Sequence, residues 1–322
     1  MGEATVRSSS WLARPSIDPE ILRSLSQPDP FRIAGSTLRT WALVAAALGF
    51  YLHVQTIWAF IISFVVIAVQ QHALSIFVHE AAHYHLARSN RWNDLLCDMF
   101  YAGPILLSIK SYRSRHWMHH GNLGTPRDSE QHPRICIRGS RVFREIVKAL
   151  LGVYAFKLFF MYNGKEHGNR SAQSLFLIGG SQAVLFLACA KAGAWFTYFT
   201  LWLLPLGTLA VAISAFRAIS EHQPWSVDRP VAEDESIGAM SRSIQSTPVE
   251  RIAFAPLNFN YHLEHDLFPG IPYHNLPRIH QELEATGYFD RSNTAYRGTY
   301  VSLLRELAFP KKGAVAAESA RG

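Results

Sequence analysis

Histidine is the residue type with the clearest capacity for chemistry in this chain, because several of its 15 copies fall in short clusters. The first cluster has the sequence HEAAH from His79 to His83, and His85 follows it. Residues four apart lie on the same face of a helix, so His79 and His83 can bind one metal ion or line one cavity. A pair of solvated surface histidines is the alternative interpretation of this motif taken alone.

Two further clusters contain the same residue type. The sequence HWMHH from His116 to His120 places three imidazoles within five residues. Protonated imidazoles that close together would repel one another, whereas neutral imidazoles bind transition metals readily. The third cluster, HLEHD, contains His262 and His265 and ends on the carboxylate of Asp266. This density of metal-binding side chains predicts a metal site rather than a solvated face.

Long apolar segments are the elements that must position these histidines. Hydrophobic residues make up 49% of the 322 residues and charged residues only 17%, which is low for a soluble domain. The apolar residues concentrate in four runs, and the second is long enough to span ~30 Å of hydrocarbon as a helix. The runs, which predict four transmembrane helices in two hairpins, cover residues 41–54, 57–77, 175–190 and 194–216.

Two other apolar stretches are poor candidates for membrane spans. Residues 95–109 contain Asp98 and Pro104, and residues 150–162 are short and contain Lys157. We therefore interpret both as interfacial or re-entrant segments. The predicted organisation is a cytoplasmic N-terminal arm at 1–40, a membrane domain at 41–310 with a cytoplasmic insert at 78–172, and a disordered tail at 311–322.

The distribution of basic residues predicts the orientation of the chain in the membrane. With four spans, the outer loops are residues 52–56 and 191–193, and Lys191 is the only one of the 31 basic side chains that falls outside. Cytoplasmic loops carry the excess of lysine and arginine in membrane proteins. Both termini and the insert are therefore expected on the cytoplasmic side of a multi-pass protein, in a bacterial inner membrane.

The same topology brings every histidine cluster to one face of the membrane. The first cluster leaves the second span on the cytoplasmic side, and no predicted span separates it from the cluster at 116–120. The third and fourth spans go out and return, which delivers His222 to the same side as the third cluster. If the number of spans between two clusters changed by one, some of these histidines would face the opposite side of the membrane. The isolated His274 and His280 are, by contrast, expected on the surface.

The three histidine boxes and the four-span hydropathy pattern together resemble the membrane-bound fatty acid desaturase/hydroxylase superfamily. The boxes read HxxxH, HxxHH and HxxHD, and residues 258–272 (NFNYHLEHDLFPGIP) are especially similar to the third box of that superfamily. The resemblance covers roughly residues 41–283. It implies an all-α membrane protein whose helical cytoplasmic cap holds a non-haem diiron site. The implied iron ligands are His79, His83, His116, His119, His120, His222, His262 and His265, with Asp266 as a further candidate.

Asp266 departs from the family pattern, which usually has a second histidine at that position. A carboxylate is a competent hard ligand for iron, so Asp266 can bind the metal directly. It can instead orient a neighbouring imidazole, or it can mark a weakened or lost second iron site. All three interpretations stay open at the level of sequence. The side chains expected to orient the ligands from outside are Glu80, His85, Glu221, Asn258, Asn260 and Glu264.

The resemblance implies O2-dependent oxidation of an aliphatic chain by two iron ions per chain. No acid, base or nucleophile among the side chains can break an unactivated C–H bond, whereas an oxidant formed on a metal cofactor can. Desaturation of a fatty acyl lipid is the first interpretation. Monooxygenase-like hydroxylation and ketone formation use the same boxes, and some bacterial members of the superfamily act on amphipathic metabolites such as dihydrorhizobitoxine.

Two other classes of protein compete with this interpretation. An intramembrane zinc metalloprotease would use His79 and His83 as ligands and Glu80 as general base, because HEAAH satisfies the HExxH motif. A catalytic zinc site needs three protein ligands, which leaves at least six candidates unused, and the Asp-Gly dipeptide of such proteases does not occur in the sequence. A structural metal in a non-catalytic membrane protein explains the spans but not the three boxes.

Basic runs such as 110–115 suit lipid headgroups, and nucleic-acid binding is not expected.

An external electron donor is also expected. The sequence contains no HPGG haem motif, no CxxC pair, no four-cysteine set and no GxGxxG loop, so it lacks the motifs that hold common electron-storing cofactors. A ferredoxin or a cytochrome b5 type carrier, with its reductase, would have to dock on the basic cytoplasmic face. The arginines expected on that face are Arg113, Arg115, Arg138, Arg141 and Arg144.

The four-span topology makes a prediction that fusion reporters can test. A reporter fused after Gly322 and one inserted between Val54 and Gln55 should report opposite sides of the membrane, because one span lies between Gln55 and the cytoplasmic N-terminus. Alkaline phosphatase activity and fluorescence of a cytoplasmic reporter are the measurements. Reporters that indicate the same side at both positions would show that the arrangement is wrong.

Overall fold

A computed structural model describes residues 14–123, 127–129, 139–163, 172–222, 237, 241–291 and 296–309 of the chain. Within them the backbone is predominantly helical, and β1 and β2 form a short parallel pair. The expected disordered tail lies outside the described residues. In chain order the elements are α1 (Pro19–Leu25), α2 (Pro30–Val54), α3 (Ile57–Ala82), α4 (Asn90–Cys97), η1 (Asp98–Ala102), η2 (Gly103–Ile105), α5 (Ile109–Asn122), α6 (Ser140–Leu150), α7 (Val153–Asn163), α8 (Ala172–Lys191), α9 (Trp195–Thr197), η4 (Tyr198–Leu203), η5 (Leu206–Ala210), α10 (Val211–Glu221), β1 (Ser243–Ile244), α12 (Pro248–Ala253), η7 (Pro256–Asn258), α13 (His262–Leu267), η8 (Tyr273–Asn275), α14 (Leu276–Ala285), α15 (Tyr288–Arg291), β2 (Tyr296–Arg297) and α16 (Tyr300–Ala308).

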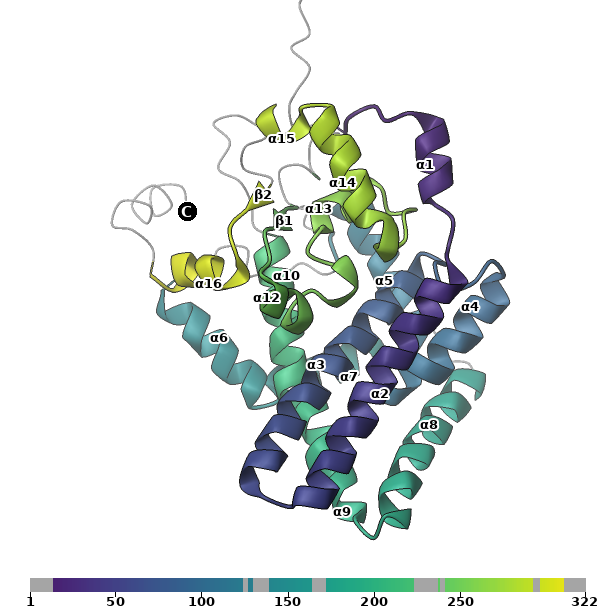
Figure 1. The fold of residues 1–322 in the computed structure, drawn as a ribbon, viewed down its shortest axis with the longest axis vertical. Coiled ribbons are helices and arrows are strands. Elements are labelled where there is room, and N and C mark those ends of the chain that lie inside the picture. Colours follow the sequence, from purple (N-terminus) through teal and green to yellow (C-terminus); the bar gives the residue numbers. More distant parts are fainter. Residues whose placement is uncertain are drawn as a thin grey trace, which may run out of the picture.

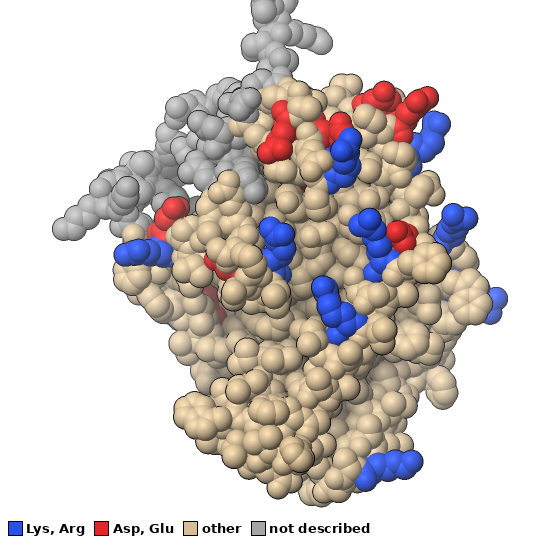
Figure 2. Space-filling view, in the orientation of Figure 1, with Lys and Arg blue, Asp and Glu red and all other residues tan. Residues whose placement is uncertain are grey.

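The helices form a lower bundle and an upper cap (Figure 1). The bundle contains α2, α3, α8 and the continuous stretch from α9 to α10, and each of these four is long and apolar enough to cross a membrane. The cap contains α1 and the elements α13 to α15. On the face shown in Figure 2, charged side chains gather in the upper part, and the lower part of the bundle is nearly free of them. The all-α membrane fold with four spanning helices is therefore confirmed.

The spanning helices are longer than the apolar runs of the sequence. α2 begins at Pro30 rather than at residue 41, because the Asp29 side chain accepts hydrogen bonds from the N–H groups of Phe31 and Arg32 at 3.0 and 3.1 Å. Part of the expected N-terminal arm, residues 30–40, is thus continuous with the first spanning helix. Hydropathy marks only the apolar part of a helix, whereas capping residues set its ends. The other three spanning stretches cover Ile57–Ala82, Ala172–Lys191 and Trp195–Glu221.

Both helical hairpins turn at the short polar loops expected from the sequence. Gln55 adopts a left-handed φ of 52°, and the Thr56 hydroxyl caps α3 by accepting from the N–H of Ala59 at 3.2 Å. In the second hairpin Gly193 has a φ of 71°, which glycine adopts without steric strain. These turns place α2 beside α3 and α8 beside α9.

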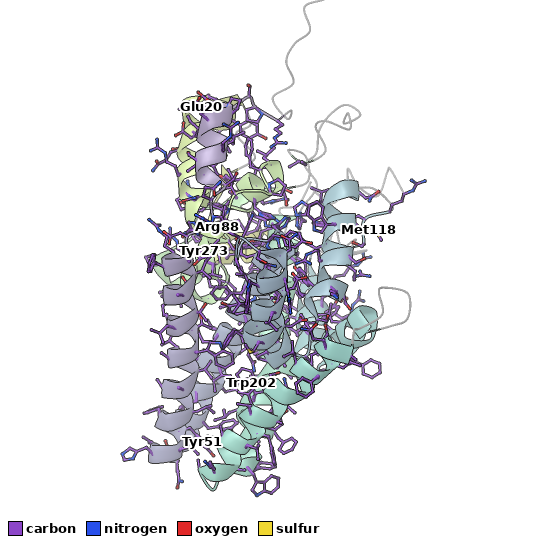
Figure 3. The ribbon with its side chains drawn as sticks, turned by 90° about the vertical axis from the view of Figure 1, so that its right-hand side faces the viewer. Glu20, Tyr51, Arg88, Met118, Trp202 and Tyr273 are labelled. Carbon is purple, nitrogen blue, oxygen red and sulfur yellow. The ribbon has the colours of Figure 1, made fainter. Side chains whose placement is uncertain are left out.

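The ambiguous stretch at 95–109 enters the bundle without spanning it, as η1 and η2. The carbonyl oxygens of Gly103 and Pro104 accept from Gln182 Nε2 at 2.8 and 2.9 Å, and that of Pro104 also accepts from the Trp202 indole at 3.1 Å. Gln182 lies on α8 and Trp202 lies among the spanning helices (Figure 3). Backbone carbonyls without partners are costly in hydrocarbon, so these donors permit short helices that end inside the bundle. The segment is therefore re-entrant.

The second ambiguous stretch, at 150–162, forms most of α7. This helix has only 11 residues and is too short to cross the hydrocarbon. It contacts η5, α10 and α5, so it lies against the outside of the fourth spanning stretch and the helix of the second histidine box.

Gln182 is expected to stabilise the re-entrant segment. Gln182→Leu keeps a similar volume but removes the donor shared by two carbonyls, which should cost about 1–3 kcal/mol and lower the apparent melting temperature in detergent. Ser181→Ala is the matched control, because the Ser181 hydroxyl donates to Ile178 of its own helix at 2.9 Å and should change little. An unchanged melting temperature for Gln182→Leu would contradict this role.

Candidate metal centre

The predicted ligands come together where the bundle meets the cap. α3 ends beside α5. α10 delivers its following residue next to α13. The convergence that the four-span topology predicts is therefore present. The residues brought together are His79 and His83 at the end of α3, His116, His119 and His120 on α5, His222 directly after α10, and His262, His265 and Asp266 on α13.

Five of the histidines form a compact group, in which each offers one nitrogen within 4.8 Å of the others. His83 Nε2 lies 2.8 Å from His116 Nε2, and His120 Nε2 lies 3.0 Å from the same atom. His265 Nε2 is 3.3 Å from His120 Nε2, and the ring of His79 lies 4.3 Å from that of His116. Two nitrogens that bind one ion at ~2.1 Å and a right angle are ~3 Å apart, so these separations suit ligands of a single ion.

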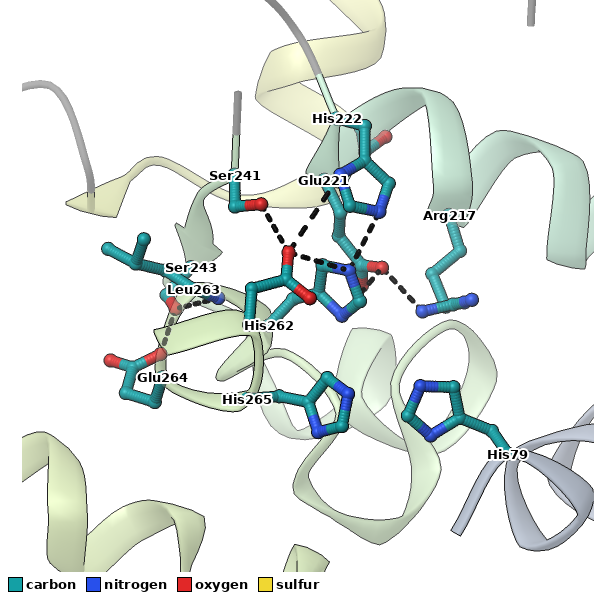
Figure 4. A network of polar contacts seen from close by, with 12 residues as sticks. His79, Arg217, Glu221, His222, Ser241, Ser243, His262, Leu263, Glu264 and His265 are labelled. Atoms are coloured by element: carbon teal, nitrogen blue, oxygen red, sulfur yellow. Dashed lines mark hydrogen bonds and ion pairs between the residues drawn. The ribbon is translucent and has the colours of Figure 1, made fainter. Parts of the chain in front are cut away.

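A second group consists of His222, His262 and Asp266, whose ligand atoms also lie within 4.8 Å of one another. His262 Nε2 is 2.8 Å from His222 Nε2 and 3.5 Å from Asp266 Oδ2 (Figure 4). His119 belongs to neither group, although its ring lies 4.9 Å from that of His222. His119 Nδ1 contacts Asp128 Oδ1 at 2.8 Å, so Nε2 is the nitrogen that His119 could offer to an ion beside the second group.

The chemistry of this donor set fits a transition metal. Both ring nitrogens of His79 are buried without a hydrogen-bond partner among the described residues. Burial lowers the pKa of His83 well below its usual 6.5, and the adjacent imidazoles lower it further. Burial and neighbouring imidazoles act in the same direction on the pKa values of His262 and His265. Neutral imidazole is the metal-binding form, and iron is among the metals it suits.

Two side chains hold α5 against the end of α3. Arg113 donates to the carbonyl oxygens of Ala81 and Ala82 at 2.8 and 3.2 Å, and Trp117 Nε1 donates to that of Ala82 at 3.1 Å. The last carbonyls of a helix lack partners within the helix, and cationic donors there are favourable. These contacts fix the helix of the second histidine box relative to the helix of the first.

Five arginines were expected on the cytoplasmic docking face, and this prediction is wrong for two of them. Arg113 is used in the helix contacts described above, and Arg115 is buried. Arg141 and Arg144 are exposed, whereas Arg138 lies outside the described residues. The physical reason is that Arg113 donates to the carbonyls at the end of α3 and Arg115 donates to the carbonyl of Ser129, contacts that the sequence of the run does not reveal.

Glu80 lies between His79 of the first box and His85 after it, and it is hydrogen-bonded to His85. Glu80 Oε1 lies 3.5 Å from His79 Nδ1, and Glu80 Oε2 contacts His85 Nδ1 at 3.0 Å and accepts from the N–H of Tyr273 at 2.9 Å. The carboxylate is fully buried among these partners. A residue used in this way orients ligands, which disfavours the role of general base in a zinc protease.

Glu221, at the end of α10, lies next to His262 of the third box. Glu221 Oε2 is paired with Arg217 and lies 3.6 Å from His262 Nδ1 (Figure 4). Glu221 Oε1 accepts from the Tyr300 hydroxyl at 2.9 Å. Tyr300 begins α16, so the last helix reaches the metal centre through this carboxylate. Glu221 therefore lies beside His262, and its role in orienting that ring stays a prediction.

Glu264 anchors α13 through two residues that the sequence did not single out. The Ser243 hydroxyl donates to Glu264 and accepts from the N–H of Leu263 at 3.2 Å. His280 Nδ1 lies 2.5 Å from Glu264 Oε1, and His280 is buried. The expectation that His280 and His274 lie on the surface is wrong, because both histidines are buried in the cap next to the third box.

The two asparagines of the third box act on the backbone. Asn258 Nδ2 donates to the carbonyl of Tyr273 at 3.3 Å, and Asn260 Nδ2 donates to that of Ile244 at 3.2 Å. The N–H of Ile244 donates in return to the carbonyl of Asn260 at 2.9 Å. These bonds tie the entry of α13 to β1 and to η8.

Several supporting residues could not be identified from the boxes. Asp128 follows the second box by only eight residues, so a search for carboxylates near the boxes could have found it. Arg217 precedes Glu221 by four residues on α10, so the i,i+4 spacing of a helix could have found it. The others lie far along the chain from the group they touch, and no spacing rule connects them. They are Ser241, Ser243, Tyr273, His280 and Tyr300.

Comparison with known proteins is consistent with the geometry. A sequence model of the family described as fatty acid desaturase matches residues 55–300. The chain is also similar to dihydrorhizobitoxine desaturase from Bradyrhizobium elkanii, with 26% identity over 278 residues that cover 79% of this chain and 76% of the relative. The matched residues include all four segments that carry the histidines and Asp266.

His280 is expected to stabilise the fold in a pH-dependent way. Burial alone would lower the pKa of His280, but the hydrogen bond to Glu264 and the charges of Glu264 and Glu284 outweigh it and raise the pKa above 6.5. A raised pKa adds stability that is complete below the unfolded value and is lost as the pH rises through the folded value. His280→Gln should therefore lower the apparent melting temperature more at about pH 6 than at about pH 9. An equal penalty at both pH values would contradict the ion pair.

Proposed function

The chain belongs to the fatty acid desaturase family, and on this premise we propose that it is a membrane-bound, O2-dependent oxidoreductase that introduces a double bond into an aliphatic chain at a diiron centre. The observation that supports the proposal most directly is the pair of adjacent ligand groups at the cap end of the bundle. Each group is rich in imidazole, and a zinc protease or a single structural metal leaves one of them without a role.

The two groups define which residues would hold the iron ions. The five-histidine group would hold one ion, and the second group, completed by His119, would hold the other. When bound, the metal pair supplies the O2-derived oxidising power that removes hydrogen from an unactivated C–H bond. Asp128 is in contact with Nδ1 of His119, which would leave Nε2 of that ring for metal. The buried Glu80 and Glu221 lie 3.5 and 3.6 Å from Nδ1 of His79 and His262, so their negative charge would favour metal binding through the opposite nitrogens.

Phe259 keeps the space between the groups apolar. Its ring lies 4.5 Å from that of His79, 5.1 Å from that of His262 and 5.7 Å from that of His265, and it is fully buried. The guanidinium of Arg217 lies 4.5 Å from the centroid of the same ring. A dry environment protects a strong oxidant from side reactions. Phe259 therefore excludes water where the two ligand groups meet.

Two substrate classes fit this centre. The family description favours a fatty acyl lipid, whose tail suits a site at the membrane face. The similarity to dihydrorhizobitoxine desaturase favours an amphipathic specialised metabolite as the second candidate. Hydroxylation or ketone formation on either substrate would use the same residues.

An external electron donor completes the proposed reaction. Desaturation takes two electrons from the substrate, and reduction of O2 to two water molecules consumes four, so two more must come from another source. We assign them to a ferredoxin or cytochrome b5 type carrier with its reductase. The carrier would dock on the cytoplasmic face, with both termini of the chain on that side of a bacterial inner membrane.

Metal analysis and product analysis test this function together. Protein purified in detergent under reducing conditions should contain about two irons per chain. With NAD(P)H, a carrier and its reductase it should convert a fatty acyl lipid or an amphipathic amino acid to a product two hydrogens lighter by mass spectrometry. NAD(P)H alone should give no turnover. His262→Ala should abolish conversion, because it removes the Nε2 atom that lies 2.8 Å from His222 Nε2 in the second ligand group.

His53→Ala is the matched control, because His53 is exposed in the last turn of α2 and should be dispensable. One zinc and no iron would overturn the assignment of the metal. A fully iron-loaded chain that leaves both substrate classes unchanged would overturn the proposed reaction.

A further inference from the structure

We propose that Asp266 links the two ligand groups. Its Oδ2 supplies a ligand to the second group, and its Oδ1 places a negative charge beside His120, a ligand of the first group. The inference rests on the proposed diiron centre, and it concerns the position at which this chain departs from the histidine pattern of the third box. It assigns Asp266 two roles at once, whereas the sequence leaves them as alternatives.

The second group surrounds one oxygen of the carboxylate. Asp266 Oδ2 lies 3.5 Å from His262 Nε2 and 4.0 Å from His222 Nδ1. The Ser241 hydroxyl donates to the same oxygen (Figure 4). A carboxylate oxygen has two lone pairs, so Oδ2 can accept from Ser241 and still bind a cation. The hydroxyl thereby orients Oδ2 toward the two histidines.

The other oxygen faces the first group through His120. Asp266 Oδ1 lies 3.7 Å from His120 Nδ1. The opposite nitrogen of that ring, Nε2, lies 3.0 Å from His116 Nε2 and 3.3 Å from His265 Nε2. His120 therefore presents one nitrogen to the five-histidine group and the other to Asp266. When an imidazole binds metal through Nε2, a carboxylate beside its Nδ1–H makes the ring a stronger ligand.

Only a side chain with two acceptor atoms can serve both groups. An ionised carboxylate has two oxygens that accept independently, whereas a neutral imidazole that binds metal through one nitrogen carries a proton on the other. A histidine at position 266 could therefore replace Oδ2 as a ligand but could not supply the negative acceptor that Oδ1 places 3.7 Å from His120 Nδ1. The Asp266→His substitution thus separates the two roles.

Titration of the metal-free full chain with Co2+ tests the link without reference to turnover. The wild type in detergent should bind two Co2+ per chain, followed by visible absorption of the bound ion. His79→Ala and His222→Ala assign the two binding steps, because each removes one ligand from one group. Asp266→Ala should lose the second-group ion and weaken binding at the first group by ~10–100-fold. Asp266→His should restore the ion of the second group, but binding at the first group should stay weakened.

Asp98→Asn is the matched control, because Asp98 is another buried carboxylate and accepts from the N–H of Ile109 at 2.8 Å. It should leave both binding steps unchanged. The link would be overturned if Asp266→Ala lost the ion of the second group but bound the ion of the first group normally. It would also be overturned if Asp266→Ala still bound both ions and showed only weaker binding at the first group. Recovery of both steps in Asp266→His would do the same. A wild type that binds a single Co2+ would overturn the diiron centre itself.

Discussion

The structure depends on holding imidazole nitrogens from separate chain segments about 3 Å apart in a buried space. The closest pairs, His83 with His116 and His222 with His262, lie at 2.8 Å. Protonation of both partners would bring two repelling charges together, so the arrangement favours neutral rings, which are the form that can bind a cation among them. The contacts of Arg113 with the end of α3 and of Ser243 with α13 serve this constraint, because they fix the elements on which the rings sit.

The membrane bundle supplies the rigid frame for this approach. Histidines leave the spanning helices at their ends, where the chain passes from apolar to polar surroundings. One level deeper, His72 on α3 contacts Ser214 on α10 at 2.8 Å and the carbonyl of Phe254 at 2.9 Å. This buried contact joins two spanning helices and the loop after α12, so the spacing of the helix ends is fixed from inside the bundle. The re-entrant segment is likewise held by hydrogen bonds from side chains of the spanning helices to its backbone carbonyls.

Local periodicity explains which features could be predicted from the sequence. Spacing along one helix placed His79 and His83 together, and hydropathy with charge bias placed all clusters on one side of four spans. Contacts between distant segments could not be predicted in this way. His280 looked like a surface residue because its partner Glu264 lies on another helix, and Arg113 looked like part of a docking face because its acceptors are the carbonyls of α3. Helix ends differed because capping by Asp29, rather than hydropathy, begins α2.

The buried carboxylates complete the electrostatic argument. Imidazoles are neutral ligands, so they leave the charge of bound cations uncompensated. Asp266, Glu80 and Glu221 are buried within about 4 Å of the histidine rings, and Asp128 contacts His119. Burying several carboxylates together is unfavourable unless positive charge lies among them. Arg217 pairs with Glu221, but cations among the histidines would serve the whole set. The same charges that orient the ligands thus make the site favourable when it holds metal and costly when it does not.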